Sequence, residues 1–189
     1  IVDIREIIRA IKSVHDYDFF FFFLTSLKQR LERLMNNYGM TSADGLIKKI
    51  AQEPAFFDVF LYDISVSSTE MFRDPSLWRW LREVYFPEAL DKNIGKFKIW
   101  LPDCVSGGEL YSLAIWMSEM GFTDKVQITA TYISDKVLEI LKNGYYDTKK
   151  LEVSEENYKR ANGARELSAY YRTEKTGIVR NTSLIANVE

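Results

Sequence analysis

One stretch near the middle of the chain constrains the fold more than any other. Residues 97–101 form a short apolar run of strand-forming residues, residues 102–109 contain two adjacent glycines, and residues 110–116 return to an apolar, helix-like pattern. This succession predicts a strand, a turn and a helix. Together they make the first βα unit of a nucleotide-type fold, whose ligands bind above the strand ends.

The turn of this unit, Val105 to Glu109, has two interpretations. Glycines let a backbone approach a ligand closely, and unpaired N–H groups at the start of a helix face the crevice above the strands. The sequence Val-Ser-Gly-Gly-Glu does not match the GxGxxG pattern of dinucleotide-binding loops, and its acidic residue favours a ligand with an amino group. From these residues alone, a ligand loop and an ordinary βα turn both stay open.

Composition and charge exclude several functional classes. The 189 residues can bury a substantial core, and the net charge of −2 with a pI near 5.6 argues against a general nucleic-acid binder. The single cysteine, Cys104, rules out an internal disulfide, and nothing resembles a signal peptide, so a cytoplasmic location is expected.

Neither a metal site nor a histidine-based catalytic site is expected. The one histidine, His15, lies in a polar, turn-like stretch, and together with one cysteine it leaves no Cys/His zinc site. Residues 19–24 form an apolar run far shorter than the ~20 residues that span a membrane, so no membrane insertion is expected.

Residues 1–64 are predicted to form a small all-helical N-terminal domain. Apolar residues at three- and four-residue spacing, together with start and stop signals, predict helices over residues 1–14, from Ser26 to Gly39, from Thr41–Asp44 onward and from Pro54 onward. The run Phe19–Phe23 has no period. We interpret it as buried among the helices, with an exposed partner site as the alternative.

The remainder is predicted to be a linker with a connecting helix, residues 65–95, and an α/β domain, residues 96–189. The following elements are predicted beyond the central unit: a strand at 126–132, a helix capped by Ser134 and ending at Gly144, a short helix starting at 154–156, and brief strands at 170–172 and 178–180. So few elements cannot cover both faces of a doubly wound sheet, so the sequence is expected to end partway through a domain.

Taken in order, several stretches resemble the CheR-type chemotaxis-receptor glutamate methyltransferases. The matching stretches are Tyr17–Phe19, Ser26–Met35, Thr69–Pro75, Ile99–Trp100, Cys104–Ser112 and Leu138–Tyr146. The resemblance covers nearly the whole chain, and its specificity lies in the ordered combination. It implies an α/β fold class, in which a small all-helical N-terminal domain precedes a partial Rossmann-like S-adenosylmethionine-dependent methyltransferase domain.

The resemblance also implies cofactor-binding residues. By position it assigns Ser67, Thr69 and Arg73 to the methionine part of S-adenosylmethionine, and Glu109 and the loop glycine Gly107 to the same cofactor. In this scheme Arg73 pairs with the α-carboxylate, and Glu109 or loop carbonyls balance the α-amino group. S-adenosylhomocysteine would be the product. No catalytic residue is identified.

Several residues depart from the family pattern. Gly108 replaces the first glutamate of the loop, Leu110 replaces a proline, Ser67 replaces an asparagine, and Tyr132 stands at the position of the ribose-binding aspartate. Losing that acid removes charge-assisted hydrogen bonds worth roughly 1.5–3 kcal/mol, so we expect cofactor affinity to fall ~10- to 100-fold. The later part of the family's domain is also missing from this sequence, so the polypeptide by itself is not expected to be a competent enzyme.

A basic face of Lys28, Arg30 and Arg33 looks like the family's surface for acidic, methylated receptor helices, with a merely solvated face as the alternative. The expected partner is thus an acidic helical protein such as a chemoreceptor cytoplasmic domain, and not a nucleic acid. The predicted function is methyl transfer to its glutamate side chains. The alternative is a degenerate, non-catalytic CheR-like interaction module. A dinucleotide-binding oxidoreductase is disfavoured by the loop and by the absent ribose acid.

Overall fold

The computed structural model describes the chain except for residues 1–3, 20–21, 66–68, 93–94 and 176. The chain divides into two compact units, residues 1–66 and residues 67–189, and each is described by itself. The domain limits expected from the sequence, at residues 64 and 95, remain predictions. No helix within the described ranges is long and apolar enough to cross a membrane.

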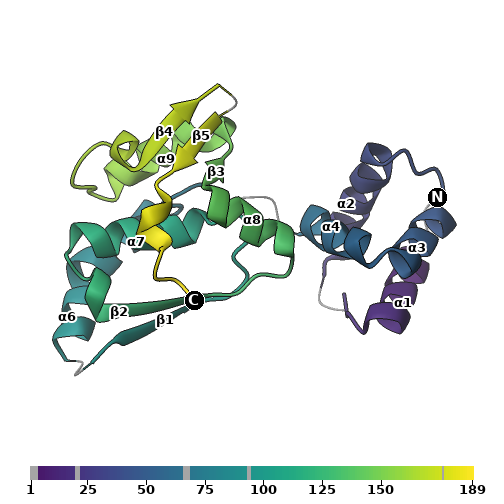
Figure 1. Ribbon diagram of the computed structural model, residues 1–189, viewed down its shortest axis with the longest axis horizontal. Coiled ribbons are helices and arrows are strands. Elements are labelled where there is room, and N and C mark those ends of the chain that lie inside the picture. Colours follow the sequence, from purple (N-terminus) through teal and green to yellow (C-terminus); the bar gives the residue numbers. More distant parts are fainter. Residues whose placement is uncertain (1–3, 20–21, 66–68, 93–94, 176) are drawn as a thin grey trace. The chain divides into compact units, whose positions relative to one another are not determined.

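The described residues of the first unit form four helices, as predicted. They are α1 (Ile4–His15), α2 (Leu24–Asn37), α3 (Ala43–Gln52) and α4 (Pro54–Ile64) (Figure 1). Their apolar stripes meet in one core that contains Ile7, Ile11, Leu27, Leu31, Leu34, Leu46, Ile50 and Phe60. Local signals set the boundaries, because the Ser42 side chain accepts a hydrogen bond from the N–H of Gly45 and a proline opens α4.

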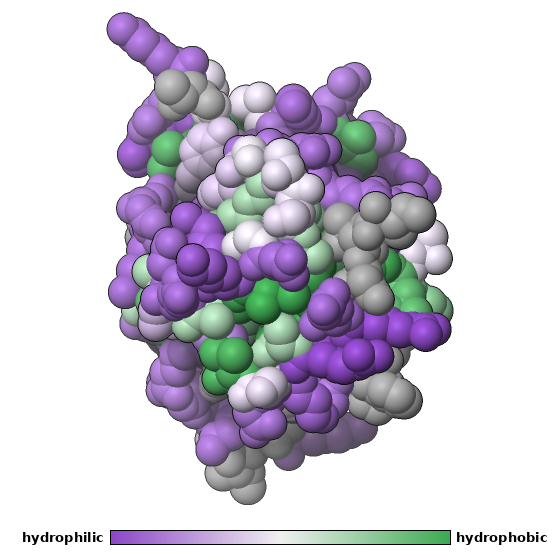
Figure 2. Space-filling view, turned by 90° about the vertical axis from the view of Figure 1, so that its right-hand side faces the viewer, coloured by the Kyte–Doolittle hydropathy of each residue, from purple (hydrophilic) through white to green (hydrophobic). Residues whose placement is uncertain are grey.

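The phenylalanine run before α2 is divided between core and surface. The Phe19 side chain is buried and its ring makes an edge contact with Phe60, whereas Phe23 is 85% exposed. Phe20 and Phe21 lie outside the described residues. Figure 2 faces this unit and shows a mainly hydrophilic surface crossed by a narrow apolar strip. The predicted burial of this run is therefore confirmed for Phe19, whereas Phe23 is exposed, as in the alternative.

The second unit contains a parallel strand pair. Strands β1 (Phe97–Leu101) and β2 (Val126–Ala130) pair in register, and α7 (Gly108–Glu119) connects them, as the sequence predicts. The backbone of Glu189 exchanges hydrogen bonds with Ile128 and Ala130 of β2. The next residue along, Thr131, donates its N–H toward β1 instead. Glu189 therefore lies along the edge of β2 away from β1.

Helix α7 forms the centre of this unit. Leu110 to Met117 are buried without interruption, and a helix that is buried on every side must have neighbours all round. The parallel pair lies on one side of α7, and α9 (Leu151–Arg160) with a small second sheet lies on the other (Figure 1). Helix α8 (Asp135–Asn143) follows β2, starting at the Ser134 cap and ending at Gly144, as predicted.

The second sheet is antiparallel and was not foreseen as a separate layer. It consists of β3 (Tyr145–Tyr146), β4 (Tyr171–Glu174) and β5 (Gly177–Arg180), in the order β3–β5–β4. The two brief strands predicted near residues 170 and 178 are confirmed. The helix predicted to start at residues 154–156 was placed too late, since α9 starts at Leu151 and Ser154 is a buried residue inside it.

The remaining elements lead into β1 or connect the others. Helix α5 (Pro75–Trp80) continues through a π-helical turn, Leu81–Tyr85, into α6 (Phe86–Asp91). Short 3₁₀ turns cover Thr123–Lys125, Thr148–Lys150, Leu167–Tyr170 and Thr182–Ile185. The connecting helix predicted within residues 65–95 is thus present, although its middle turn is π-helical.

A buried carboxylate joins α7 to its neighbours. The Glu119 side chain is fully buried and accepts hydrogen bonds from the guanidinium of Arg82, the hydroxyls of Tyr158 and Tyr170, and the N–H of Ala164. Each carboxylate oxygen thus serves two donors. A buried charge is tolerated when it is paired and fully hydrogen-bonded, and this one meets both conditions.

We expect Glu119→Gln to lower the free energy of unfolding of this unit by about 3 kcal/mol, because glutamine keeps a single acceptor oxygen and leaves Arg82 without a counter-charge. Urea denaturation followed by tryptophan fluorescence measures this unit alone, since all four tryptophans lie in residues 67–189. Glu156→Gln, at an exposed position of α9, is the matched control and should change stability by less than about 0.5 kcal/mol. Equal effects of the two variants would contradict the assignment.

Candidate functional site

The loop between β1 and α7 has a tightly fixed backbone. The N–H of Cys104 donates to the carbonyl of Thr131 at 2.7 Å, which holds the loop against the end of β2. Gly107 has a left-handed φ of +73°, and a Cβ there would lie 2.3 Å from Leu141 Cδ2. Only glycine satisfies both the backbone conformation and the available space.

The segment that precedes α5 lies directly against the first turn of α7. Thr69 Oγ1 donates to Glu109 Oε1 at 2.5 Å, and the N–H of Phe72 donates to Ser112 Oγ at 2.9 Å. A Cβ on Gly108 would lie 2.9 Å from the carbonyl oxygen of Thr69. Both loop glycines therefore have a packing role in the protein, because Thr69 and Leu141 occupy the space beside them.

Phe72 anchors this segment. Its ring is fully buried against Trp78, Trp116 and Tyr158, and its backbone has a positive φ of 53°. Asp74 also has a positive φ, 58°. A positive φ is uncommon for a bulky residue such as phenylalanine and persists where the surroundings enforce it, so burial of Phe72 fixes the path of the chain next to Arg73.

Arg73 itself is exposed, between these two constrained residues. The pKa of the Glu70 carboxyl is lowered, first by a hydrogen bond from its own backbone N–H, then by Lys150 and by the positive charge of Arg73. Arg73 is therefore close enough to act electrostatically on the segment that contacts Glu109. Ser67, which the resemblance assigns to the same ligand, lies outside the described residues.

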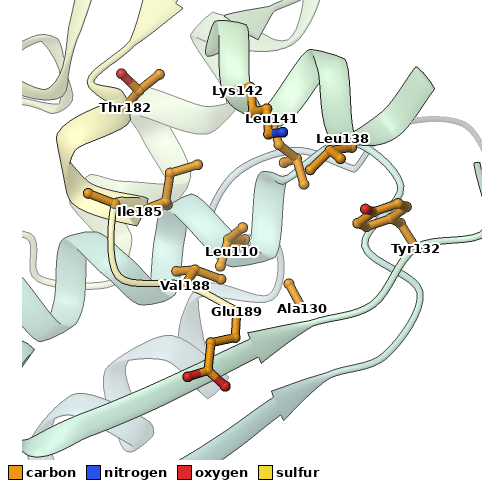
Figure 3. A pocket seen from close by; sticks show the side chains of 11 residues that line it. Leu110, Ala130, Tyr132, Leu138, Leu141, Lys142, Thr182, Ile185, Val188 and Glu189 are labelled. Carbon is orange, nitrogen blue, oxygen red and sulfur yellow. The ribbon is translucent and has the colours of Figure 1, made fainter. Parts of the chain in front are cut away.

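A cavity of about 380 Å³ opens beyond the end of β2 (Figure 3). It is lined mainly by apolar side chains: Leu110, Ala130, Tyr132, Leu138, Leu141, Lys142, Thr182, Ile185, Ala186, Val188 and Glu189. Figure 3 shows the Tyr132 ring beside Leu138 at one side of the cavity, while the Glu189 carboxylate points away from it. Leu110 directly follows Glu109, so the cavity begins next to the loop.

The three basic residues of α2 have different roles. Arg30 is half-buried and its Nη1 donates to the carbonyl of Ile64 at 2.7 Å, which caps the last turn of α4. Lys28 and Arg33 are exposed. Lys28 forms a long ion pair with Glu32 on the same helix, and Arg33 Nη2 donates weakly to the carbonyl of Asp63 at 3.5 Å. Only Lys28 and Arg33 thus present their charges mainly to solvent.

Sequence reasoning missed two polar side chains that shape the site. Ser112 lies inside α7 and holds the backbone of Phe72, and the Tyr146 hydroxyl accepts from the N–H of Met71 and bonds Ser154. A serine within an apolar helix and a tyrosine after a helix carry no local signal for such roles. In the part of the chain that the structure describes, no group of His, Cys, Asp and Glu side chains could hold a metal ion.

Comparison with known proteins gives a consistent result. Residues 67–175 match the family model described as CheR methyltransferase, SAM binding domain. The chain is 30% identical to the putative methyltransferase Cher3 of Pseudomonas putida over 187 residues, which are 99% of this chain and 68% of that protein.

Two further relatives match a smaller share of this chain. A chemotaxis protein methyltransferase of Listeria innocua is 26% identical over 81% of this chain and 58% of its own length. Chemotaxis protein methyltransferase 1 of Pseudomonas aeruginosa is 32% identical over 65% of this chain and 47% of its own. The chain thus spans about half to two thirds of the length of these relatives.

Cys104 offers a chemical test of the loop's order. Burial, together with the negative charge of Glu109, raises the pKa of its thiol to about 11 from an ordinary 9.0. At pH 8 the thiolate fraction is then about 100-fold lower in the folded than in the unfolded protein. We expect reaction of this single cysteine with a thiol-specific disulfide reagent to be at least about 100-fold slower in buffer than in urea.

The rate should also keep rising about tenfold per pH unit beyond pH 9, because the folded thiol is still protonated there. A rate that levels off near pH 9, or that equals the rate in urea, would show that the loop is open.

Proposed function

This chain belongs to the CheR methyltransferase family, and we propose that it binds S-adenosylmethionine at residues 69–73 and 104–109 for methyl transfer to glutamate side chains of a chemoreceptor-like protein. The hydrogen bond between Thr69 and Glu109 is the observation that carries this proposal. It joins two segments 40 residues apart that the family resemblance assigns to one ligand. Since relatives are longer, the activity proposed is that of a protein containing this chain.

The charges of these segments suit the methionine end of the cofactor, which has one carboxylate and one ammonium group. An arginine fork binds a carboxylate through two parallel hydrogen bonds, and Arg73 is exposed, so its guanidinium is accessible to one. The Glu109 carboxylate suits the ammonium group, and Thr69 holds it in one orientation. Gly107 contributes its backbone, in a conformation fixed by the packing of Leu141.

The adenosyl end of the cofactor is proposed to lie toward the cavity beside Tyr132. The walls there are apolar, and Leu110 connects them to the loop. Tyr132 offers a ring and a hydroxyl where an acid would accept hydrogen bonds from ribose. The affinity for the cofactor should therefore be ~10- to 100-fold lower than in a relative with that acid, because a charge-assisted hydrogen bond is lost.

The residues present are compatible with the chemistry. When bound, the cofactor would supply an electrophilic methyl group on a sulfonium, which an ionised glutamate carboxylate could accept without a general base, with S-adenosylhomocysteine as the leaving group. This chain's residues then need only bind, orient and shield the reactants from water. Arg73, Glu109 and Thr69 bind and orient, and the apolar cavity beside Tyr132 excludes water. The sequence's lack of a suitable histidine is therefore no objection.

A non-catalytic interaction module is the second candidate. Gly108 and Tyr132, which stand where the family has acids, favour it. In either case we propose that Lys28 and Arg33 attract an acidic helical segment of a chemoreceptor's cytoplasmic domain, which would place the protein in the cytoplasm. The two candidates differ in whether S-adenosylhomocysteine binds.

Arg73→Ala should abolish calorimetrically measurable binding of S-adenosylhomocysteine at millimolar ligand, because the variant loses the proposed partner of the α-carboxylate. Stability should change by less than about 0.5 kcal/mol, since Arg73 is exposed. Arg79→Ala, another exposed arginine six residues further on, is the control and should bind like the unaltered chain.

Unchanged affinity of Arg73→Ala would remove this residue from the site. Failure of the unaltered chain to bind millimolar ligand would remove the methyltransferase proposal and leave the interaction module.

The docking surface can be tested by reversing Lys28 and Arg33 together to glutamate, with Arg30 left in place because it caps α4. At low salt we expect this variant to bind a purified chemoreceptor cytoplasmic domain about tenfold more weakly, and the difference should shrink as salt rises. The control reverses Lys159 and Arg160, two exposed residues of α9, for the same change in net charge. If both variants bind alike, the α2 face is only solvated.

A further inference from the structure

A buried arginine contacts the loop between β1 and α7, residues 102–107, which we call the cofactor loop. Arg180, the last residue of β5, is 1% exposed, and no carboxylate among the described residues forms an ion pair with it. Burial lowers the pKa of its guanidinium to about 10, so the side chain stays charged at neutral pH. A buried charge without a counter-charge is costly unless other groups satisfy it.

Backbone carbonyls and aromatic rings take the place of a counter-ion. Nη2 donates to the carbonyls of Ser106 at 3.1 Å and Tyr145 at 2.9 Å, and Nε donates to the carbonyl of Gly144 at 3.2 Å. The guanidinium also lies 4.0 Å from the centre of the Tyr111 ring. One side chain thus joins the cofactor loop, the end of α8 and strand β3.

The guanidinium lies close to the loop, and some polar atoms at this contact have no hydrogen-bond partner. Nη1 would lie 3.5 Å from a Cβ placed on Gly107, so the guanidinium borders both residues that precede α7. Nη1 and the Ser106 hydroxyl are both buried without a hydrogen-bond partner among the described residues. Unsatisfied buried donors cost stability, and apolar packing here would avoid that cost.

We propose that Arg180 is a positioning residue for cofactor binding, which fixes the backbone of Ser106 and Gly107 so that Glu109 is presented to the ligand. The proposal rests on the proposed function. Because the same guanidinium holds β3 and the end of α8, it couples the three-stranded sheet to the loop.

The test compares Arg180→Met, Arg180→Lys and the control Arg172→Met. Methionine fills similar space without charge, and it leaves the carbonyls of Ser106, Gly144 and Tyr145 without the Arg180 donor, so some stability is expected to be lost. Lysine keeps the charge but cannot reach three carbonyls as a planar fork. Arg172 is on the neighbouring strand β4, exposed and paired with Glu174, so its loss changes the same charge without touching the loop.

Two readouts are measured together with urea stability: the dissociation constant for S-adenosylhomocysteine and the rate of Cys104 labelling at pH 8. We expect Arg180→Met to raise both at least tenfold, which is more than its loss of stability accounts for. Loss of the positive charge by itself raises the pKa of the Cys104 thiol and slows labelling, so faster labelling must come from opening of the loop. Arg180→Lys should raise both less, and Arg172→Met should change neither. A purely structural role would change labelling only in proportion to the loss of stability.

Wild-type values of both quantities in Arg180→Met would overturn the proposal. If that variant does not fold, Arg180→Lys decides: a raised dissociation constant with faster labelling supports the positioning role, and wild-type values overturn it. If the unaltered chain binds no S-adenosylhomocysteine, the proposed function fails, and the role in cofactor binding falls with it. Labelling would still report whether Arg180 holds the loop.

Discussion

The packing of residues 69–74 against the first turn of α7 is the contact on which the candidate site depends. Phe72 fills a buried aromatic cluster, and its N–H is held by Ser112. That anchor brings Thr69 to Glu109 and leaves room beside it only for a glycine at position 108. The proposed ligand groups are therefore positioned by a packed core, which gives them the preorganisation that binding a small zwitterion requires.

Buried charges hold α7 at both of its ends. Arg180 contacts the loop before its first turn, and Glu119 is its last residue. Both have the sign that the helix macrodipole disfavours at that end, so hydrogen bonds must hold them in place. Glu119 has four donors, whereas Arg180 keeps one nitrogen without a partner among the described residues. Glu119 is therefore an anchor of the fold, whereas the stability cost of the unsatisfied Arg180 nitrogen suggests that this residue has a role in binding.

Local patterns were sufficient to predict much of the fold and little of the site. Apolar spacing and caps predicted the four helices of the first unit, the βα unit and the Ser134-capped helix, because these signals act within a few residues. The start of α9 and the layer formed by β3, β5 and β4 depend on distant partners and were misplaced or missed. The burial of Arg180 and Glu119 was missed for the same reason, since sequence shows a charge but not what surrounds it. The resemblance supplied Thr69 and Glu109, and only the structure brought them into contact.

The central claim is that one ligand contacts both residues 69–73 and residues 104–109. Backbone amide chemical shifts, followed by NMR while S-adenosylhomocysteine is added to the intact chain, test it most directly. The account predicts that the largest changes fall on these two segments and on Tyr132. Changes confined to residues 4–64, or no change at millimolar ligand, would contradict it.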